Sequence, residues 1–331
     1  MSGARAFTSV LGPTIDSYLA LKKALGRGFA RETAVLAHLD RFLVARAAGT
    51  GALDGESFET WSLTLAHLKP TDRRNRMRIV RNLCLYLQRS NPGCFVPDVS
   101  RFPAPHAPEP PHIFTEQQII GLFRVAACLR PNSNSPLCPE VFRLAIVLLY
   151  TAGLRRGELV RLIISDYNPI ECTLLVRSSK FHKSRLVALS ADATREMELY
   201  LRARRRLPCD PGSPLLVNHH NGLHAYSGAG IGGSLHSLFG RADIRTVQGR
   251  IPRVHDLRHT HAVHNLLRWY RAGEDVQAKL PVLATAMGHV SIASTAYYLR
   301  FLEPVAQAAS DRFARQCMAT LAAFSGEGGG R

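Results

Sequence analysis

Six prolines fall between Phe95 and His112, in the stretch FVPDVSRFPAPHAPEPPH. They mark a boundary between two parts of the chain. Each proline fixes its own φ angle and disfavours helix at the residue before it. We therefore expect residues 99–112 to form an extended linker. Since 331 residues exceed what one core usually serves, we expect two domains, residues 1–98 and 113–331.

Basic residues outnumber acidic ones throughout the chain. The totals are 42 Lys and Arg against 25 Asp and Glu, a formal net charge of +17, of which +6 falls in residues 1–98 and +11 in residues 99–331. Such a charge favours a polyanion, because each phosphate that it neutralises releases condensed counterions. Double-stranded DNA held in a two-domain clamp is therefore the expected partner, and a basic enzyme without nucleic acid is the alternative.

The composition also excludes several classes of protein. An apolar fraction of 46% is enough to build a core, so wholesale disorder is excluded. No run approaches the ~18 apolar residues of a membrane-spanning helix, and the N-terminus lacks a secretion signal. The seven cysteines stand singly without a CxxC pair, so a disulfide framework and a thiolate zinc site are not indicated. We expect a cytoplasmic protein with no membrane, metal or cofactor.

The first domain shows helical periodicity. Apolar residues recur at three- and four-residue spacing from Val35 to Leu43, and a second helix is expected over Asp72–Leu87. One face of this second helix carries three arginines at i, i+4 and i+7, which are Arg74, Arg78 and Arg81. The stripe suits a DNA backbone, and a solvated basic face has the same pattern.

The second domain is expected to be mainly α-helical with one small antiparallel β-hairpin. Pro139–Ala152 is a strongly apolar helix that ends at a glycine. Two β-rich segments, Thr173–Val176 and Arg185–Leu189, flank the polar, basic tip Ser178–Ser184 and predict the hairpin. Helix is expected from Asp192 onward, and residues 303–324 form an amphipathic helix near the C-terminus.

Six residues in three segments and in the hairpin tip provide a metal-free set of groups for phosphoryl transfer: Arg155, Lys180, His255, Arg258, His289 and Tyr298. Guanidinium groups can each meet two phosphate oxygens, a lysine or histidine can protonate the leaving oxygen, and a phenol can attack phosphorus. A free tyrosine is only ~0.1% ionised at pH 7. Nearby cations favour its anion and offset part of that deficit.

Helical spacing places several of these groups together. His255, Arg258 and His259 stand at i, i+3 and i+4 and so project from one side of a helix. Arg155 and Glu158 stand at i and i+3, at the start of a helix expected to continue through Leu162. Glu158 is a candidate to orient a cation there, and an ordinary surface ion pair is the alternative.

The order Arg155, Lys180, His255-x-x-Arg258, His289 and Tyr298 resembles that of the tyrosine recombinases, the phage integrase family, which includes the Xer recombinases. The phrases GLRRGEL, HDLRHTHA and MGH add to the resemblance, which covers residues 113–300. The segment Arg268–Pro281 is longer than in short Xer proteins and is similar to the transposon-borne recombinase-in-trio group. Met287 stands where leucine is usual in the family.

The resemblance implies a site-specific DNA recombinase that cleaves and rejoins DNA through a 3′-phosphotyrosyl intermediate, in integration, excision or transposition. It gives each matching position a role. Tyr298 attacks the scissile phosphate, Arg155 and Arg258 clamp it, and His289 hydrogen-bonds it. Lys180 protonates the 5′ leaving oxygen, His255 assists proton transfer, and Glu158 matches the family's acidic position. The resemblance implies no cofactor.

Two neighbouring residues compete for family roles. Tyr297 adjoins Tyr298, and the nine-residue interval from His289 favours Tyr298 as the nucleophile. Lys183 competes with Lys180, and the family's lysine precedes the hairpin turn, which favours Lys180. Lys183 is then expected to contact DNA.

The resemblance also predicts the assembly. Residues 1–98 correspond to the helical, SAM-like core-binding domain, which closes over DNA opposite the catalytic domain. The expected complex is a homo-tetramer on DNA, or a hetero-assembly with related recombinases, in the bacterial nucleoid. Helix 303–324 matches the C-terminal helix that docks onto a neighbouring protomer, and packing on its own domain is the alternative.

Two other functions fit parts of the pattern. His255-Asp256-x-x-His259 mimics the HExxH zinc motif, with His261 and His264 nearby, but Arg258 would place a fixed cation on the same face as the metal. A non-catalytic DNA-binding protein of the same fold would keep the charge and lose part of the catalytic set, whereas all six positions are filled here.

Overall fold

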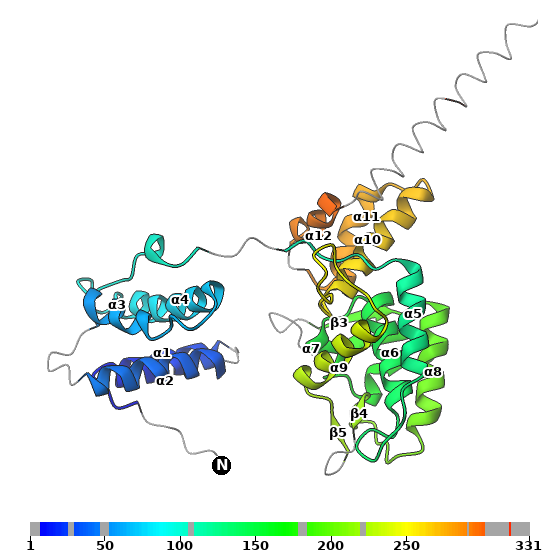
Figure 1. Cartoon of the computed structure of the whole chain (residues 1–331), viewed down its shortest axis with the longest axis horizontal. Coiled ribbons are helices and arrows are strands. Elements are labelled where there is room, and N and C mark those ends of the chain that lie inside the picture. Colours follow the sequence, from blue (N-terminus) through cyan, green and yellow to red (C-terminus); the bar gives the residue numbers. More distant parts are fainter. Residues whose placement is uncertain are drawn as a thin grey trace, which may run out of the picture. The chain divides into compact units, whose positions relative to one another are not determined.

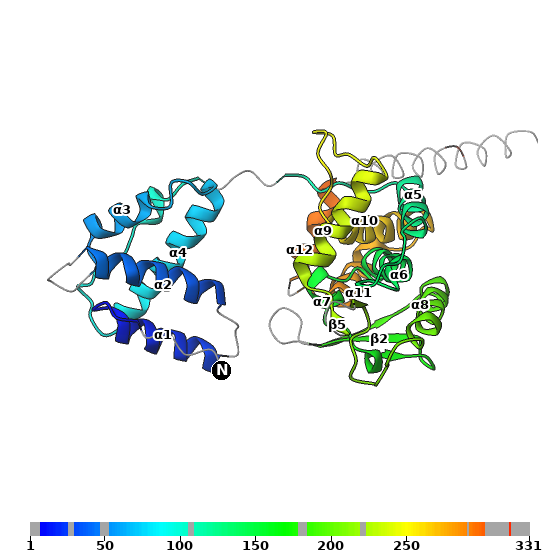
Figure 2. The ribbon, with the colours of Figure 1, turned by 60° about the horizontal axis from the view of Figure 1, so that its bottom comes forward.

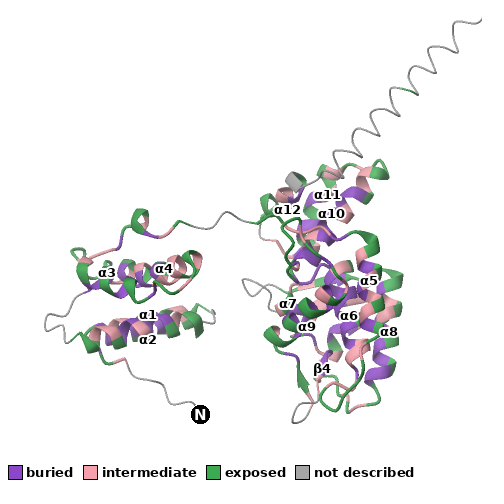
Figure 3. Cartoon of the chain, in the orientation of Figure 1, coloured by how far each residue is buried: buried purple, intermediate pink, exposed green. Residues whose placement is uncertain are grey.

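The structure is a computed structural model that describes residues 7–25, 30–46, 53–104, 109–177, 184–218, 223–289, 291–301 and 318. It divides into two compact units, Met1–Glu109 and Pro110–Arg331 (Figure 1). Each unit has its own core, which Figure 3 shows as buried residues inside each group of helices.

The first unit is helical. Its helices are α1 (Gly12–Ala24), α2 (Ala30–Ala45), α3 (Gly55–Leu63) and α4 (Pro70–Leu87). α4 begins with Pro70 in its first turn, where a missing N–H costs nothing. Trp61 is fully buried at the centre of the core, and its indole Nε1 donates to Nδ1 of His38 at 3.1 Å.

The first unit extends beyond residue 98. The predicted start of the linker, at residue 99, is therefore too early. A 3₁₀ turn, η1 (Val99–Arg101), leads to Phe102, which is buried and stacks on Phe58 with ring centroids 6.0 Å apart. Arg81 donates to the carbonyl of Pro97 at 3.0 Å, and Arg74 to that of Pro103 at 2.9 Å. Prolines prevent helix here, but they do not prevent an extended segment from packing on a helix.

Two of the three arginines in the predicted DNA-binding stripe therefore also have a structural contact. Arg74 and Arg81 hold the segment after the helix against α4 through one bond each. Arg78, between them, is exposed.

The second unit is built around helix α6 (Cys138–Thr151), eight of whose residues are buried. It packs against α5 (Glu116–Ala127), α8 (Ala191–Arg204) and α10 (Asp256–Arg271), as Figures 1 and 2 show. A helix apolar on nearly all sides is stable only when other elements surround it. α5 begins with a capping box between Thr115 and Gln118, at the acid-capped start indicated by the sequence.

The predicted β-hairpin is present. Strand β2 (Thr173–Val176) pairs antiparallel with β3 (Arg185–Ala188), with Val176 opposite Arg185. β1 (Tyr167–Asn168) completes a sheet of order β1-β2-β3, and β4 (Val217–Asn218) pairs with β5 (His224–Ala225). The hairpin tip, residues 178–183, lies outside the described residues, and so do Lys180 and Lys183.

The remaining elements are α9 (Gly228–Arg241), α11 (Val276–Met287), α12 (Ala293–Ala296) and the 3₁₀ turn η4 (Tyr297–Phe301). The mainly α fold with small antiparallel sheets is thus confirmed. The predicted helix 303–324 lies outside the described residues except for Met318. Among the helices that the structure describes, none combines the length and hydropathy needed to span a bilayer.

Candidate active site

Arg155 is positioned by a turn at the end of α6. Gly153 has a φ of 59°, and a Cβ there would lie 2.5 Å from Cδ2 of His261, so both the conformation and the space require glycine. The chain then enters α7 (Arg156–Leu159), with Arg155 as its N-cap residue. The helix ends at Leu159, earlier than the predicted Leu162.

Glu158 lies inside the protein between two arginines. It is 2% exposed, and its carboxylate accepts from Nη1 of Arg155 at 2.7 Å and from Nη1 and Nη2 of Arg185 at 3.1 and 2.9 Å. Burial raises the pKa of this carboxyl, but hydrogen bonds from Arg185 and Arg155 outweigh burial and lower it to about 2. Glu158 is thus an ionised group in a buried pair and no surface ion pair.

Three arginines converge on the C-terminal end of α11. Arg185 Nε donates to the carbonyl of Ala286 at 2.8 Å, Arg258 Nη2 to that of Met287, and Arg155 Nη2 to that of Gly288 at 2.9 Å. The last carbonyls of a helix have no intrahelical partner and carry the negative end of its dipole. The end of α11 therefore gathers cations from α7, α10 and β3.

Arg258 is the most deeply buried of these cations. It is 1% exposed, and its Nη1 also donates to the carbonyl of Gly153. Burial and the charge of Arg155 lower its pKa to about 10. The guanidinium is therefore still charged near neutral pH, and two carbonyl contacts hold it in one orientation.

Tyr298 lies beside Arg258 and is 3% exposed. Burial raises the pKa of its phenol, whereas the charges of Arg258 and Arg155 and a hydrogen bond from Arg258 oppose that rise. Its ring stacks on His289 with centroids 6.0 Å apart and meets the ring of His259 at an angle, 5.4 Å away. Tyr297, half-buried, is 6.0 Å from Tyr298 between ring centroids.

The two histidines of the predicted set differ in their surroundings. His289 Nδ1 is 2.8 Å from Oγ1 of Thr295, which is fully buried. Burial and the charges of Arg258 and Arg155 lower the pKa of His289 to about 4, so its ring is neutral at pH 7. His255 is the N-cap residue of α10, and desolvation and then the charge of Arg258 lower its pKa.

Five of the six predicted residues fall in the described part of the chain and come together there: Arg155, His255, Arg258, His289 and Tyr298. Lys180, its competitor Lys183 and the tip between the strands are outside it. In the described ranges no three His, Cys, Asp or Glu side chains gather to hold a metal ion, so a zinc site at His255 and His259 has no third ligand among them.

Three residues near this site were not among the predicted catalytic positions. Arg185 is a strand residue that no local pattern distinguishes from a solvent-facing one. Thr295 lies in a four-residue helix with no periodicity to indicate its buried face. His259 did share the predicted face with Arg258, and its buried Nδ1 has no hydrogen-bond partner among the residues that the structure describes.

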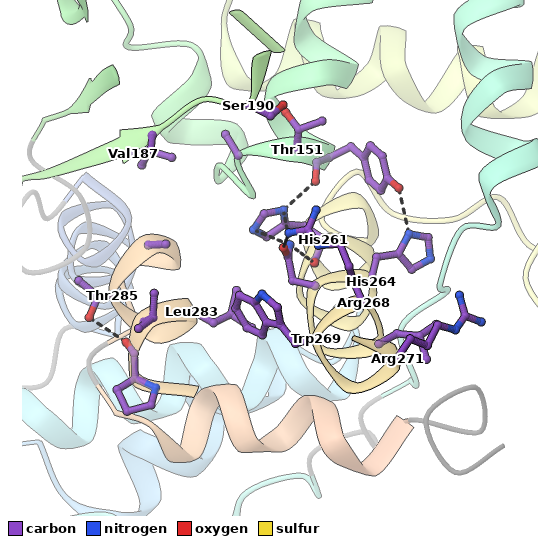
Figure 4. Close-up of a pocket in the computed structure, with 18 of the residues that line it drawn as sticks. Thr151, Val187, Ser190, His261, His264, Arg268, Trp269, Arg271, Leu283 and Thr285 are labelled. Atoms are coloured by element: carbon purple, nitrogen blue, oxygen red, sulfur yellow. Dashed lines mark hydrogen bonds between the residues drawn. The ribbon is translucent and has the colours of Figure 1, made fainter. Parts of the chain in front are cut away.

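A large cavity lies on another side of α10, lined also by α11 and β3 (Figure 4). Its volume is about 990 Å³, and its walls combine apolar side chains such as Trp269 and Leu283 with polar ones such as Arg268. His264 Nδ1 in this wall is 2.9 Å from the hydroxyl of Tyr150, and His261 Nδ1 is 2.9 Å from the carbonyl of the same tyrosine.

Known proteins resemble this chain in sequence and in fold. Residues 132–303 match the model of the phage integrase family. A Sinorhizobium fredii protein named as an integrase/recombinase, y4rE, is 31% identical over 298 residues, which cover 89% of this chain and 93% of that protein. Tyrosine recombinase XerA of Pyrococcus horikoshii is 28% identical over 190 residues, 57% of each chain.

A solved structure shows the same fold. The Tn1549 transposon integrase in complex with a circular intermediate DNA superposes with a TM-score of 0.61 at 17% identity, covering 86% of this chain and 94% of that one. Sequence, fold and the grouping of the five described residues predicted to be catalytic agree, and the chain belongs to the phage integrase family of tyrosine recombinases.

Proposed function

We propose that this protein is a site-specific DNA recombinase that cleaves and rejoins DNA through a 3′-phosphotyrosyl intermediate, without a metal. The observation that carries the proposal is the placement of Tyr298 against Arg258, with Arg155 close enough for its charge to oppose the rise in the phenol pKa that burial causes. A buried phenol beside two cations is suited to attack a phosphodiester, because the cations favour both the phenolate and the charge that develops at phosphorus.

In the proposed step, the phenol oxygen of Tyr298 forms a bond to the scissile phosphorus, and the bond from phosphorus to the 5′ oxygen breaks. The phenol loses its proton, with His255 assisting the transfer, and the 5′ oxygen gains one. The reverse attack by a 5′-hydroxyl of a partner strand restores a phosphodiester and frees Tyr298. The bond energy is retained, so neither ATP nor a cofactor is needed.

Arg155 and Arg258 act as the phosphate clamp. Each is already fixed by carbonyls at the end of α11, and a guanidinium has five N–H donors, so donors are left for the phosphate. Because the donors are fixed before the substrate binds, little reorganisation is needed during the reaction. Glu158 keeps Arg155 in place, and His289 supplies a further hydrogen bond to the phosphate.

A nicked DNA substrate that traps the covalent intermediate tests the nucleophile. We expect a protein–DNA adduct with the wild type and with Tyr297→Phe, also in EDTA, and none with Tyr298→Phe. An adduct formed by Tyr298→Phe but not by Tyr297→Phe would show that the nucleophile is Tyr297 and that the assignment of Tyr298 is wrong. A wild type that binds DNA and forms no adduct would favour the alternative, a non-catalytic DNA-binding protein.

The clamp has a separate test. Removing one preorganised donor typically lowers a rate by about 10²-fold or more. Arg155→Ala and Arg258→Ala should therefore abolish strand exchange while DNA binding stays nearly intact. Strand exchange at the wild-type rate in either variant would show that the assignment is wrong.

Lys180 is proposed as the acid that protonates the 5′ leaving oxygen, with Lys183 as a DNA contact. A substrate with sulfur in place of the 5′ bridging oxygen tests this, because a thiolate leaves without a proton at neutral pH. Lys180→Ala should cleave the ordinary substrate slowly and the sulfur substrate at the wild-type rate. If Lys183→Ala shows this rescue and Lys180→Ala does not, the two roles are exchanged.

The proposed partner is double-stranded DNA, held in a clamp by both units, with Arg74, Arg78 and Arg81 on the DNA backbone.

The proposed assembly is a tetramer, alone or with related recombinases, in which the amphipathic segment 303–324 of one protomer occupies the cavity beside Trp269 in the next. Removal of residues 303–331 should then abolish assembly on paired sites and leave binding to one site. Loss of single-site binding instead would favour packing within the same protomer.

A further inference from the structure

A second, smaller cleft lies next to His255 and is lined by other residues than the cavity at Trp269. Its volume is about 560 Å³. Among the described residues its lining contains two arginines, two histidines and no carboxylate: Arg156, Gly157, Gly232, Gly233, His236, Arg253, Val254 and His255. We call it the arginine cleft. The catalytic positions predicted from the sequence include only one of its residues, His255.

Arg156 is exposed and lies against glycines of α9. A Cβ on Gly232 would lie 2.6 Å from Nη1 of Arg156, and a Cβ on Gly228, one helical turn earlier, would lie 3.8 Å from its Nε. The guanidinium thus occupies space that a side chain at position 232 would take. Within the described ranges Arg156 forms no ion pair, so its charge is not neutralised by a carboxylate there.

Arg253 is oriented by an ion pair. Its Nη2 donates to Oδ1 of Asp256 at 2.9 Å, and its backbone N–H donates to Oδ2 at 2.9 Å. Asp256 is 1% exposed, whereas the side chain of Arg253 is half exposed. The buried carboxylate therefore orients the guanidinium while the rest of the side chain stays accessible.

Resting on the proposed function, we infer that the arginine cleft binds the DNA backbone phosphate next to the scissile one. Arg156 directly follows Arg155 in the chain, and His255 lines the cleft as well as belonging to the active site. Successive phosphates of one strand are about 3.4 Å apart along the helix axis. A strand with its scissile phosphate at Arg155 and Arg258 therefore brings a neighbouring phosphate to this cleft.

The chemistry of the cleft fits a phosphodiester. Planar guanidinium groups recognise phosphate oxygens through paired N–H donors, and here one oriented by Asp256 lies in the same cleft as one that forms no ion pair within the described ranges. Contacts to the DNA backbone set the position of a protein on DNA and carry no information about the base sequence. The cleft would thus fix which phosphate reaches Tyr298, independently of the bases.

Single methylphosphonate substitutions test the inference, because each removes the charge of one chosen phosphate. DNA affinity is measured with wild type and Arg156→Ala on duplexes that carry the substitution at each position flanking the scissile phosphate. We expect Arg156→Ala to lower affinity about tenfold on unmodified DNA and to add no further loss when the contacted phosphate is neutral. The slope of log affinity against log salt should fall by about one phosphate, ~0.9.

A glycine pair in α9 provides the matched control. Gly232→Ala should weaken binding in the same direction as Arg156→Ala, because the new methyl group displaces the guanidinium from its place. Gly228 does not line the cleft, and an alanine there meets Arg156 only at an ordinary contact distance, so Gly228→Ala should bind as the wild type does. Thermal unfolding of both variants checks that the fold is kept.

The outcomes separate this inference from the proposed function. If the losses from Arg156→Ala and from methylphosphonate add at every flanking position, or if Gly232→Ala binds like Gly228→Ala, the phosphate site is wrong. Adduct formation by the wild type on unmodified DNA is scored separately. If the wild type forms no adduct, the proposed recombinase function is wrong. The binding measurements would still test whether the arginine cleft binds a phosphate.

Discussion

Arg185 and Glu158 form a two-point ion pair in the interior of the second unit, with nitrogen–oxygen distances of 3.1 and 2.9 Å. Arg185 stands at the start of β3, directly after the hairpin segment that carries Lys180. Glu158 also holds Arg155, and Arg185 also binds the end of α11. One buried carboxylate thus joins the hairpin, the proposed phosphate clamp and the segment leading to Tyr298.

Breaking this pair should be costly. Arg185→Met leaves Glu158 with Arg155 as its remaining charged partner, and removal of one member of a buried pair typically costs about 3–5 kcal/mol in the free energy of unfolding. Arg143→Met is the matched control, since Arg143 pairs with Glu196 through two bonds at the surface, where a pair contributes about 1 kcal/mol or less. Urea denaturation of both variants measures the difference, and equal losses would contradict it.

The contacts of Arg185 could not be predicted from the sequence. The order of Arg155, His255, Arg258, His289 and Tyr298 can be read from the sequence, because the first four stand in recognisable phrases and Tyr298 follows His289 by nine residues. Arg185 pairs with a residue 27 positions earlier, and no local period encodes a contact at that separation. The three carbonyls at the end of α11 were equally hidden, because backbone acceptors leave no trace in the sequence.

In the first unit, too, a local feature was predicted from the sequence and a long-range contact was not. Local rules predicted α4 closely, with Asp72–Leu87 expected and Pro70–Leu87 observed, because helical periodicity depends on neighbouring residues. The same rules placed the linker from residue 99, because prolines exclude helix. Phe102 nevertheless packs on Phe58, 44 positions earlier, because its extended backbone does not prevent its aromatic side chain from being buried.

The histidines predict how stability depends on pH. The pKa values of His259, His261 and His289 are lowered to about 4, in each case first by burial. In the unfolded chain these rings titrate near 6.5, so between pH 6.5 and 4 the unfolded state binds more protons. Stability should therefore be full above pH 6.5 and fall as the pH drops toward 4. NMR titration of the ring protons checks this, and protonation of all three near pH 6.5 would refute it.

Gly153 should tolerate no side chain. Its φ of 59° is unfavourable for alanine, and the added Cβ would lie 2.5 Å from the buried ring of His261. Gly153→Ala should therefore destabilise the protein by more than about 1 kcal/mol. Gly121→Ala is the control, because it lies in α5 with no atom within 4 Å of the added Cβ and should be neutral or stabilising. Thermal unfolding distinguishes the two, and similar melting temperatures would show that Gly153 has room.

Thr295 sets the last test, which concerns the proton on His289. A neutral imidazole carries its proton on one nitrogen, and the partner of the other nitrogen decides which. If the hydroxyl of Thr295 donates to Nδ1, the proton is on Nε2, where it can be donated to a phosphate oxygen. Thr295→Val keeps the shape of the side chain, removes this bond and leaves Nδ1 unpaired, at a cost of about 1–3 kcal/mol.

We therefore expect Thr295→Val to slow cleavage of a nicked substrate about tenfold or more, as 1.4 kcal/mol corresponds to a factor of ten in rate. Thr295→Ser retains the hydroxyl and should cleave nearly as fast as the wild type, although it loses a buried methyl group. A purely structural role would reverse the order, since valine fills the buried space and serine does not. Cleavage rates of the two variants, measured with their melting temperatures, thus separate control of the His289 proton from packing.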